Sequence, residues 1–374
     1  MHNIFFNLPS SPAFVIDTDQ VLANLNRINT MRQASGCKVL YAMKALPLAA
    51  LLRVLKPHVD GIAVSSLFEA RLAKQVLGEE VSLHLTTPGL RADEFAELAQ
   101  LCSHISFNSL EQQRRLQALA EGYSPGLRIN PKRSYLHDDR YNPCRQYSKL
   151  GIDTAELQNA WPESVQGLHL HTLFAAHYFQ PLIETVHSLL PLLKQHGKLK
   201  WLNLGGGYLY NSITDQTELL ALLDILHNDY AEQVFIEPGK AFVGNAGYLI
   251  STVLDSFISD GKTVLILDTS VNHHPEVFEY QTRPYLFPTE PETGEVAILA
   301  GSTCLAGDIF GEYRFKQLPK IGERIMFCDV GAYSLIKANR FNGYNLPDIY
   351  QLKNGQTTLL KQYDYADYER QWLV

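Results

Sequence analysis

The run 38-KVLYAMK-44 decides the fold, because it is the first of eight short, apolar, β-rich runs that recur every 20 to 40 residues. The other seven are 61-GIAVS-65, 81-VSLHLT-86, 104-HISFN-108, 126-GLRIN-130, 166-QGLHLH-171, 200-KWLNL-204 and 233-QVFIE-237. Helix-compatible segments separate them. In 91-RADEFAELAQLC-102, for example, Phe95, Leu98 and Leu101 fall on one face behind an acidic start. This alternation of short strands and longer helices predicts a (β/α)8 barrel.

A second, β-type domain is expected after the barrel, because beyond residue 240 the helical rhythm gives way to β-rich runs between turns that contain Gly and Pro. These runs are 248-YLISTVLDSFI-258, 263-TVLILD-268, 296-VAILAG-301, 324-RIMFCDVG-331 and 357-TTLLKQY-363. A full helix, 18–33, separates the early run 13-AFVID-17 from the first barrel strand, so this run is free to pair with the C-terminal sheet instead. We therefore predict an α/β chain with a barrel over residues 23–240 and a β domain formed by 1–22 and 241–374.

Length and composition exclude several classes of protein. At roughly 150 residues per domain, the 374 residues exceed a small binding module, and 46% hydrophobic with 19% charged residues exclude a disordered chain. The net charge of −7 is spread without long runs of one sign, which argues against a nucleic-acid or anionic-membrane surface. A small-molecule partner is favoured, and a cationic one mildly so.

The cysteines and the N-terminus indicate the compartment. Five widely spaced cysteines, an odd number without a CxxC pair, indicate neither a disulfide framework nor a zinc site. No apolar stretch approaches the ~20 residues of a membrane span, and residues 1–12 lack a basic region followed by a long apolar one. We expect a soluble, untargeted protein of the reducing cytoplasm.

In a (β/α)8 barrel the chemistry gathers at the carboxyl ends of the strands, and here those ends carry reactive or polar residues. In chain order they are Lys44, Ser65 and Ser66, Thr86 and Thr87, Asn108, Arg128 and Asn130, His171, Gly205, Gly206 and Gly207, and Glu237. By itself, the triple glycine is equally consistent with an ordinary flexible turn. After strand seven, however, it lies where barrels bind phosphate through backbone N–H groups, and Lys240 adds a cation nearby.

A lone lysine in a barrel is most often a solvated side chain. The residues at the other strand ends indicate a functional role for Lys44. A lysine amine, a phosphate cradle, a histidine and a carboxylate at one barrel mouth suit a pyridoxal phosphate site, in which the cofactor acts as an electron sink. Glu237 is the candidate carboxylate for the pyridine nitrogen, which it keeps protonated.

Seven motifs, in order along nearly the whole chain, resemble those of the fold-type III pyridoxal phosphate enzymes. This group includes alanine racemase and the ornithine, diaminopimelate and carboxynorspermidine decarboxylases. The motifs are 41-YAMKA-45, 64-VSSLFE-69, 169-HLHTL-173, 204-LGGGY-208, 237-EPGKAF-242, 301-GSTCLAGD-308 and 331-GAYS-334. The carboxynorspermidine decarboxylases are the most similar branch, through 128-RINP-131, 142-NPC-144, 148-SKLG-151, 273-HHPEVFE-279, 303-TCLAGD-308 and 341-FNGYNLP-347. The resemblance implies an alanine racemase-like barrel with a C-terminal β domain.

The resemblance also implies a role for each matched residue. Lys44 is the Schiff-base lysine, and Cys304 is the acid that returns a proton to Cα after carbon dioxide leaves. The cofactor-binding residues are His171 stacked on the ring, Glu237 on the ring nitrogen, and Gly205, Gly206, Gly207, Gly239, Lys240 and Tyr333 around the phosphate. A head-to-tail homodimer is implied as well, in which each subunit contributes its cysteine loop to the site of its neighbour.

The expected reaction is α-decarboxylation. A carboxylate on the pyridine nitrogen favours full delocalisation of the Cα electrons, whereas alanine racemase places an arginine there. The resemblance implies a substrate with a 3-amino-3-carboxypropyl end, carboxynorspermidine or carboxyspermidine, in polyamine biosynthesis. The substrate-binding candidates are Asp308, Glu276 and Glu279 for ammonium groups, His273 as a pocket residue, and Arg283 for a carboxylate. Each of these acids is equally well explained as an exposed surface charge, and Arg283 as a side chain that packs against a tyrosine.

Three positions depart from the carboxynorspermidine branch. Phe174-Ala175 replace a Cys-Glu pair, Lys240 turns the branch's EPGE into EPGK, and Gly331-Ala332 precede the late tyrosine. Leu305 stands where diaminopimelate decarboxylases carry a glutamate, which speaks against that substrate. The lost carboxylate at residue 175 keeps open the same decarboxylation on a non-polyamine carrier, of the kind trimmed in microcin C-type maturation.

Two further alternatives belong to other classes. A non-catalytic homologue that binds pyridoxal phosphate or a partner protein is opposed by the retention of Lys44, Glu237 and Cys304. His169 and His171 form an HxH pair that also suits a metal-dependent hydrolase, but no matching ligand set accompanies it, and we expect no metal.

Overall fold

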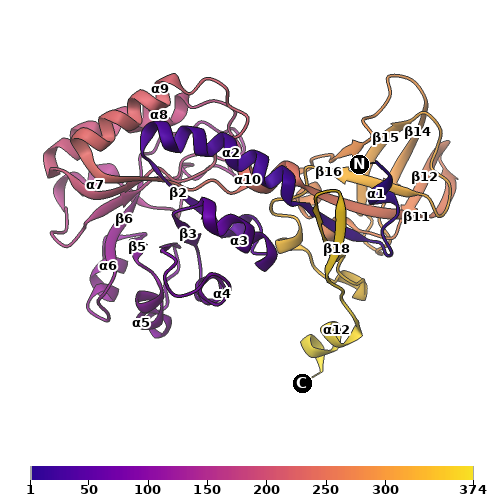
Figure 1. The fold of residues 1–374 in the computed structure, drawn as a ribbon, viewed down its shortest axis with the longest axis horizontal. Helices are drawn as coiled ribbons and strands as arrows, with labels where there is room; N and C mark the ends of the chain where they lie inside the picture. The colour runs from indigo at the N-terminus through magenta and orange to yellow at the C-terminus, as the bar shows by residue number, and fades with distance from the viewer. Residues whose placement is uncertain (1, 374) are drawn as a thin grey trace. The chain divides into compact units, whose positions relative to one another are not determined.

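The computed structural model describes residues 2–373, with side chains from Ile4 onward. It divides into two compact units, one of Met1–Ala23 with Phe242–Val374 and the other of Asn24–Ala241. Figure 1 shows the second of these as a strand-and-helix unit and the first as a sheet-rich one. The predicted α/β fold, a barrel plus a separate β domain, is confirmed.

Eight parallel strands close into a barrel within the described part of the chain. They are β2 (Lys38–Ala42), β3 (Gly61–Val64), β4 (Leu83–Thr86), β5 (His104–Phe107), β6 (Ser124–Asn130), β8 (Gly167–His169), β9 (Leu199–Asn203) and β10 (Ala231–Ile236). The order β5-β4-β3-β2-β10-β9-β8-β6 is closed by the pairing of β5 with β6, and the two-residue β7 (Ile152–Asp153) adds to the edge of β6. All eight strands coincide with the runs predicted from sequence.

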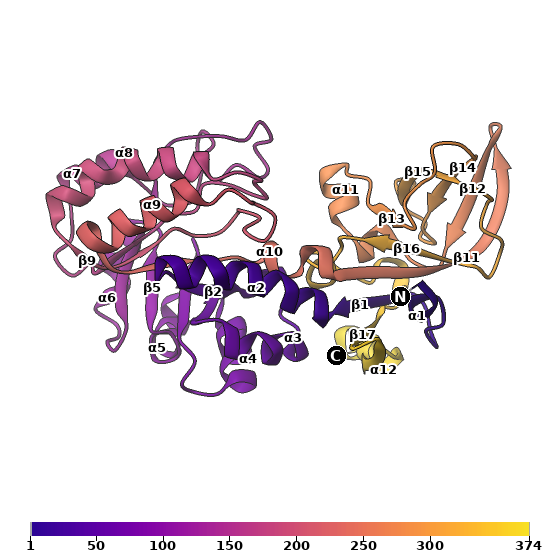
Figure 2. The ribbon, with the colours of Figure 1, turned by 45° about the horizontal axis from the view of Figure 1, so that its top comes forward.

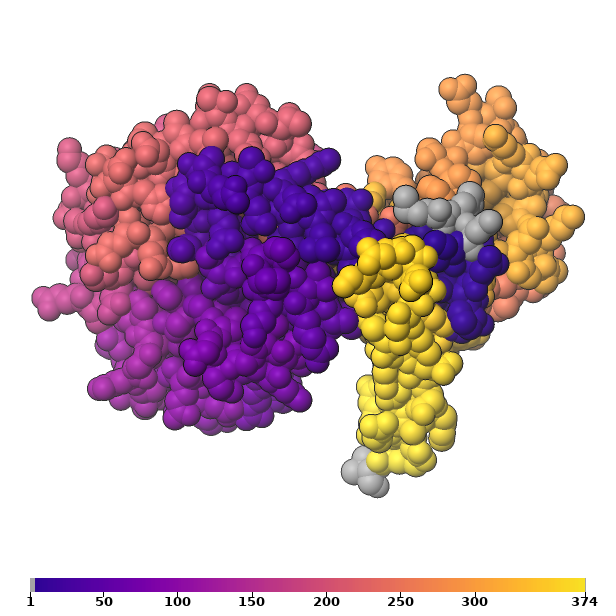
Figure 3. Space-filling model, viewed as in Figure 1, coloured from indigo at the N-terminus to yellow at the C-terminus, as the bar shows by residue number. Residues whose placement is uncertain are grey.

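Helices lie on the outside of the barrel (Figure 2), and Figure 3 shows the atoms of the same part of the chain on one face. These helices are α3 (Ala49–Leu55), α4 (Leu67–Leu77), α5 (Ala92–Leu101), α6 (Leu110–Gln117), α7 (Thr154–Asn159), α8 (Gln180–His196) and α9 (Thr217–Ile225), preceded by α2 (Thr18–Ser35) and followed by the short α10 (Lys240–Val243). Serine side chains cap two of them, since Ser66 accepts from the Glu69 N–H and Ser109 from the Gln112 N–H.

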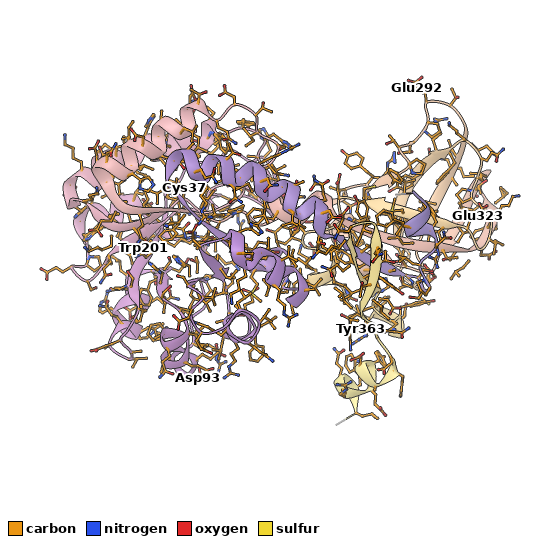
Figure 4. All side chains as sticks on the ribbon, in the orientation of Figure 1. Cys37, Asp93, Trp201, Glu292, Glu323 and Tyr363 are labelled. Carbon is orange, nitrogen blue, oxygen red and sulfur yellow. The ribbon has the colours of Figure 1, made fainter. Side chains whose placement is uncertain are left out.

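Trp201 of β9 fills the barrel where β6 and β8 begin (Figure 4). Its ring requires glycines on the neighbouring strands, because an added Cβ would lie 2.3 Å from the ring at Gly126 and 2.0 Å from it at Gly167. The indole N–H donates to Ser124 Oγ at 2.8 Å. The amino-terminal end of the barrel is thus packed shut, and the polar residues gather at the other end.

Within residues 2–373, the β domain holds one nine-stranded sheet and three short α-helices. Its strands are β1 (Ala13–Asp17), β11 (Gly247–Ser259), β12 (Lys262–Leu267), β13 (Tyr285–Phe287), β14 (Glu295–Ala300), β15 (Ile309–Phe315), β16 (Arg324–Cys328), β17 (Asp348–Lys353) and β18 (Gln356–Lys361). The helices are α1 (His2–Phe6), α11 (Glu276–Tyr280) and α12 (Tyr365–Trp372). β1 lies between β11, with which it is antiparallel, and β17, with which it is parallel, so the early run does belong to the C-terminal sheet.

The sequence prediction was incomplete in this domain. Three strands were missed, namely β13, β15 and β17. The predicted strand 324–331 is also too long, because Asp329 has a left-handed φ of 59° and ends β16 at Cys328.

Among residues 2–373, no helix combines the length and the apolar character that crossing a bilayer requires.

The fit of Trp201 makes a prediction about stability. Gly167→Ala pushes a methyl group against the indole, and overpacking of this kind costs about 1–3 kcal/mol. We expect the thermal unfolding midpoint to fall by roughly 2–10 °C. Gly89→Ala is the matched control, because a Cβ there meets nothing within 4 Å. Equal midpoints for the two variants would show that the barrel end is not packed as described.

Candidate active site

Lys44 follows β2 in a single 3₁₀ turn, Met43–Ala45, at the carboxyl-end mouth of the barrel. Its neighbours Met43 and Ala45 are both buried, whereas Lys44 itself is accessible at the mouth. It lines a cavity of about 650 Å³, together with residues from β3, β4, β6 and the loop that follows β6. A cavity of this size suits a cofactor with a small substrate.

The surroundings of Lys44 lower the pKa of its amine. Desolvation by the surrounding barrel wall is the main cause that lowers the pKa of its amine, and the Arg128 guanidinium lowers it further. Glu237 and Glu69 oppose this shift without cancelling it. Burial also lowers the pKa of Arg128, to about 10, so this side chain stays cationic at neutral pH. The result is an amine that loses its proton more readily than a lysine of ordinary pKa.

Glu237 follows β10 and is 7% exposed, yet its carboxyl group is ionised. Burial alone would raise its pKa, but nearby positive and hydrogen-bonding groups outweigh burial and hold the pKa well below its usual range. Asn203 Nδ2 donates to Oε1 at 2.7 Å, and His169 Nε2 lies 3.6 Å from Oε2. Lys44 contributes further attraction. The barrel mouth therefore holds a fixed negative charge.

The triple glycine after β9 is a locked turn. Gly205 and Gly207 have φ values of 67° and 93°, and a Cβ on either would lie 2.0 Å from the carbonyl oxygen of Leu170 or Leu173. The Gly205 N–H donates to Asn203 Oδ1 at 2.9 Å, which ties the turn to the amide that holds the Glu237 carboxylate. Side chains are excluded here, so the backbone approaches its surroundings closely.

His171 is tied to the same turn. Its Nδ1 accepts the Gly206 N–H at 3.2 Å, which places the proton of the neutral ring on Nε2. Desolvation lowers the pKa of His171 well below its usual value, and the positive charges of Lys44 and Arg128 lower it further. A neutral imidazole therefore borders the cavity beside Lys44.

Phe174 has a role that sequence reasoning missed. Its ring stacks on Tyr141 with centroids 5.2 Å apart and an interplanar angle of 21°, and Lys240 Nζ lies 5.5 Å from its centroid. Phe174, which stands where the branch has the cysteine of its Cys-Glu pair, thus stacks on Tyr141 and offers its ring face to Lys240. Only the location of these three residues in space reveals it, because they are distant in sequence.

The loop after β6 covers one side of the mouth and was also missed as a functional element. Asn108 and Asn130, which were counted as strand-end candidates, instead anchor this loop. Asn108 Nδ2 donates to the Lys149 carbonyl at 2.8 Å, and Asn130 Nδ2 donates to the Leu150 carbonyl at 2.9 Å. The loop presents Arg140, Arg145 and Lys149 to the cavity.

The remaining predicted residues lie in the β-domain unit. Cys304 is exposed, and its backbone N–H donates to Asn342 Oδ1 at 2.8 Å. Asp308 is buried and already engaged, since it accepts the Val271 N–H at 2.8 Å and the Thr303 N–H at 3.0 Å. Asp308 therefore holds the loop that carries Cys304.

Tyr333 and Glu276 form a second group in that unit. Burial, followed by the Glu276 carboxylate and Tyr280, raises the pKa of Tyr333. Residue 331, two positions before this tyrosine, has to be glycine, because a Cβ there would lie 1.8 Å from the Val243 carbonyl oxygen. This contact accounts for the glycine at a position where the sequence departs from the carboxynorspermidine branch.

Three other substrate candidates have partners within the unit. His273 Nδ1 lies 3.0 Å from Thr269 Oγ1, and burial lowers the pKa of His273 to about 4. Arg283 binds Glu290 at 2.6 Å and lies over the Tyr313 ring, while Glu279 pairs with Lys337. Among the described residues no group of three or more His, Cys, Asp or Glu is arranged to hold a metal ion.

The geometry agrees with a match to a known family. The family model described as "Pyridoxal-dependent decarboxylase, C-terminal sheet domain" matches residues 13–331. The chain belongs to the pyridoxal-dependent decarboxylase family. The predicted resemblance and enzyme class are thereby confirmed, and the non-catalytic alternative is set aside.

Two curated relatives and one solved structure support this assignment. This decarboxylase is 32% identical to the carboxynorspermidine/carboxyspermidine decarboxylase of Campylobacter jejuni over 98% of this chain and 99% of the relative. It is 34% identical to the carboxyaminopropylagmatine decarboxylase of a Synechocystis species over 97% of this chain and 95% of the relative. The crystal structure of carboxynorspermidine decarboxylase complexed with norspermidine from C. jejuni matches with a TM-score of 0.85 and 29% identity, covering 97% of this chain and all of that one.

The electrostatics of Lys44 predict the pH dependence of its reactivity. In cofactor-free protein, acylation of Lys44 by acetic anhydride should reach half its maximal rate at a lower pH than acylation of a free lysine derivative, because only the neutral amine reacts. Arg128→Met removes a cation and should move this profile to higher pH, whereas Glu69→Gln removes an anion and should move it lower. Peptide mass spectrometry measures the labelling. Shifts of the same direction in both variants would contradict the assigned causes.

Proposed function

We propose that this decarboxylase removes the α-carboxylate from an amino acid with a 3-amino-3-carboxypropyl end, with carboxynorspermidine or carboxyspermidine as substrate in polyamine biosynthesis. The observation that carries the proposal is the pairing of a lysine of lowered pKa with an ionised, buried glutamate at one barrel mouth. The substrate class is supported by the relatives named as carboxynorspermidine/carboxyspermidine and carboxyaminopropylagmatine decarboxylases.

The residues at the mouth fit pyridoxal phosphate. Lys44 supplies the amine that holds the cofactor covalently, Glu237 faces the ring nitrogen, and His171 offers a neutral ring face. We assign the phosphate to the turn formed by Gly205, Gly206 and Gly207, where an added Cβ would clash. Gly239, Lys240 and Tyr333 are the other residues proposed to bind it. When bound, pyridoxal phosphate supplies an electron-accepting ring for the electrons released as carbon dioxide leaves.

Within this proposal each protein group has a separate task. The ionised Glu237 holds a proton on the ring nitrogen, and Asn203 keeps the carboxylate in place through its 2.7 Å hydrogen bond. The lowered pKa of Lys44 makes its amine easier to deprotonate, as a nucleophile or base requires. The exposed Cys304 thiol supplies the proton that replaces the carboxylate at Cα.

We further infer a head-to-tail homodimer of the reducing cytoplasm. The dimer follows from the family resemblance, in which the cysteine loop of one subunit completes the site of the other. The compartment is supported by the five cysteines, all of which are unpaired.

Glu276 is the best supported of the acids proposed for the distal ammonium groups of the substrate. It is 6% exposed and acts on the proposed phosphate ligand Tyr333 through its charge. Asp308 and Arg283 are engaged inside the β domain, so we assign them to holding the substrate-binding loops. His273 stays a proposed pocket residue beside Asp308, whose charge acts on it.

A second candidate substrate is favoured by one observation. The cavity at the barrel mouth is lined by five cationic side chains, Lys44, Arg128, Arg140, Arg145 and Lys149, against the single carboxylate of Asp139. After Lys44 and Arg128 are assigned to the reaction centre, the rim still carries three cations, of which Arg140 also pairs with Asp138. A polyamine gains nothing from this rim, whereas an aminocarboxypropyl group on a phosphate-bearing carrier does.

The cofactor proposal predicts a spectroscopic result. The purified protein reconstituted with pyridoxal phosphate should show visible absorbance that sodium borohydride bleaches, leaving the label on the peptide that carries Lys44. Lys44→Ala should lack the labelled peptide, while Lys56→Ala, on the outer surface, should retain it. A colourless protein that cannot be reconstituted would refute the cofactor proposal.

The substrate proposal is tested by carbon dioxide release from a panel of amino acids. Carboxynorspermidine and carboxyspermidine should give kcat/KM values roughly 100-fold or more above those of ornithine, lysine and diaminopimelate, because recognition of distal groups contributes to the transition state. Preference for an aminocarboxypropyl nucleotide would establish the second candidate instead. Racemisation without gas release would overturn decarboxylation altogether.

A further inference from the structure

A second cavity, of about 690 Å³, lies within the β-domain unit and plays no part in the proposed reaction. Its walls come from α1, from the edge strand β13 and the segment after it, and from the ends of β15 and β16. Most of the surface is apolar, with aromatic rings and prolines that include Phe6, Phe287, Pro288, Phe315 and Pro319. The size and character are those of a small-molecule site.

The charged residues of this cavity are all cationic. Arg314, Lys316 and Arg324 line it, and no carboxylate is found among the described lining residues. Two acids close to the lining residues along the chain have partners of their own. Glu290 binds the Arg283 guanidinium and the Arg314 backbone N–H, and Glu323 accepts the Lys320 N–H. The charged side chains that line the cavity are therefore of one sign.

Arg324 provides the independent observation. Its Nη1 is buried and has no hydrogen-bond partner in the described structure. The backbone of Arg324 is fixed by the pairing of β16 with β11, opposite Thr252, so the side chain starts from a fixed point on the cavity wall. A guanidinium N–H without an acceptor costs free energy, and a turn of the side chain towards an anion in the cavity would satisfy it.

We infer that this cavity binds an organic anion with an aromatic body. The carboxylate or phosphate of the ligand binds Arg324, with Arg314 and Lys316 as the further cations, and its ring packs between Phe287 and Phe315. The site rejects polyamines, because its three cations repel them, so it is distinct from the proposed substrate site. The inference does not rest on the proposed function.

The test is isothermal titration of the reconstituted enzyme with two probes, 3-phenylpropanoate and phenyl phosphate. At least one should bind saturably with one site per subunit, and the stronger of the two identifies the preferred anionic group. Binding should weaken about tenfold or more in Arg324→Gln and for the uncharged 3-phenylpropan-1-ol. Arg370→Gln, which removes an exposed arginine of α12 outside the cavity, is the matched control and should bind as the unsubstituted enzyme does.

A second variant protects the test against misfolding. Arg314→Gln combined with Lys316→Gln alters two exposed side chains and should weaken binding about threefold or more while leaving the thermal midpoint and decarboxylation unchanged. The inference is wrong if neither probe saturates at millimolar concentration, or if the alcohol binds as well as the anions. It is also wrong if this double variant binds as tightly as the unsubstituted enzyme. Decarboxylation measured in the same preparations reports separately on the proposed function.

Discussion

The buried charge of Glu237 is the interaction on which the barrel mouth depends. A carboxylate that is 7% exposed stays ionised only because Asn203 donates to it and cationic or hydrogen-bonding groups surround it. The same Asn203 amide accepts the Gly205 N–H, and Gly206 in turn donates to His171. One continuous hydrogen-bonded chain therefore fixes the carboxylate, the glycine turn and the imidazole. Loss of any member would leave another buried polar group unsatisfied.

Barrel packing explains why this network sits at one end. Trp201, seated on Gly126 and Gly167, closes the interior near the starts of the strands, so polar side chains have room only at the carboxyl ends. Burial there acts in opposite directions on the two reactive groups. It lowers the pKa of Lys44, while the local donors and cations overcome its effect on Glu237. A lysine amine of lowered pKa beside a fixed anion is the combination that pyridoxal chemistry requires.

The sequence predicted the barrel well because its strands are buried on both faces and read as continuous apolar runs, and the strand-end residues followed from that count. The β domain was harder. The strand 309-IFGEYRF-315 is interrupted by Gly311 and charged residues, and 348-DIYQLK-353 mixes polar and apolar positions. The stack of Tyr141, Phe174 and Lys240 could not be read from the sequence, since it joins three distant segments. Likewise, the internal partners of Asp308 and Arg283 could not be read from the sequence, since they lie on distant or irregular segments.

The central claim is that Glu237 is ionised at neutral pH, and an infrared difference spectrum between the protein and its E237Q variant measures this directly. The account predicts that the substitution removes an ionised carboxylate stretching band, and that this band persists well into the acid range because the pKa of Glu237 is lowered. Removal of a protonated carboxyl C=O band at neutral pH would show that Glu237 is a neutral acid, and would contradict the account.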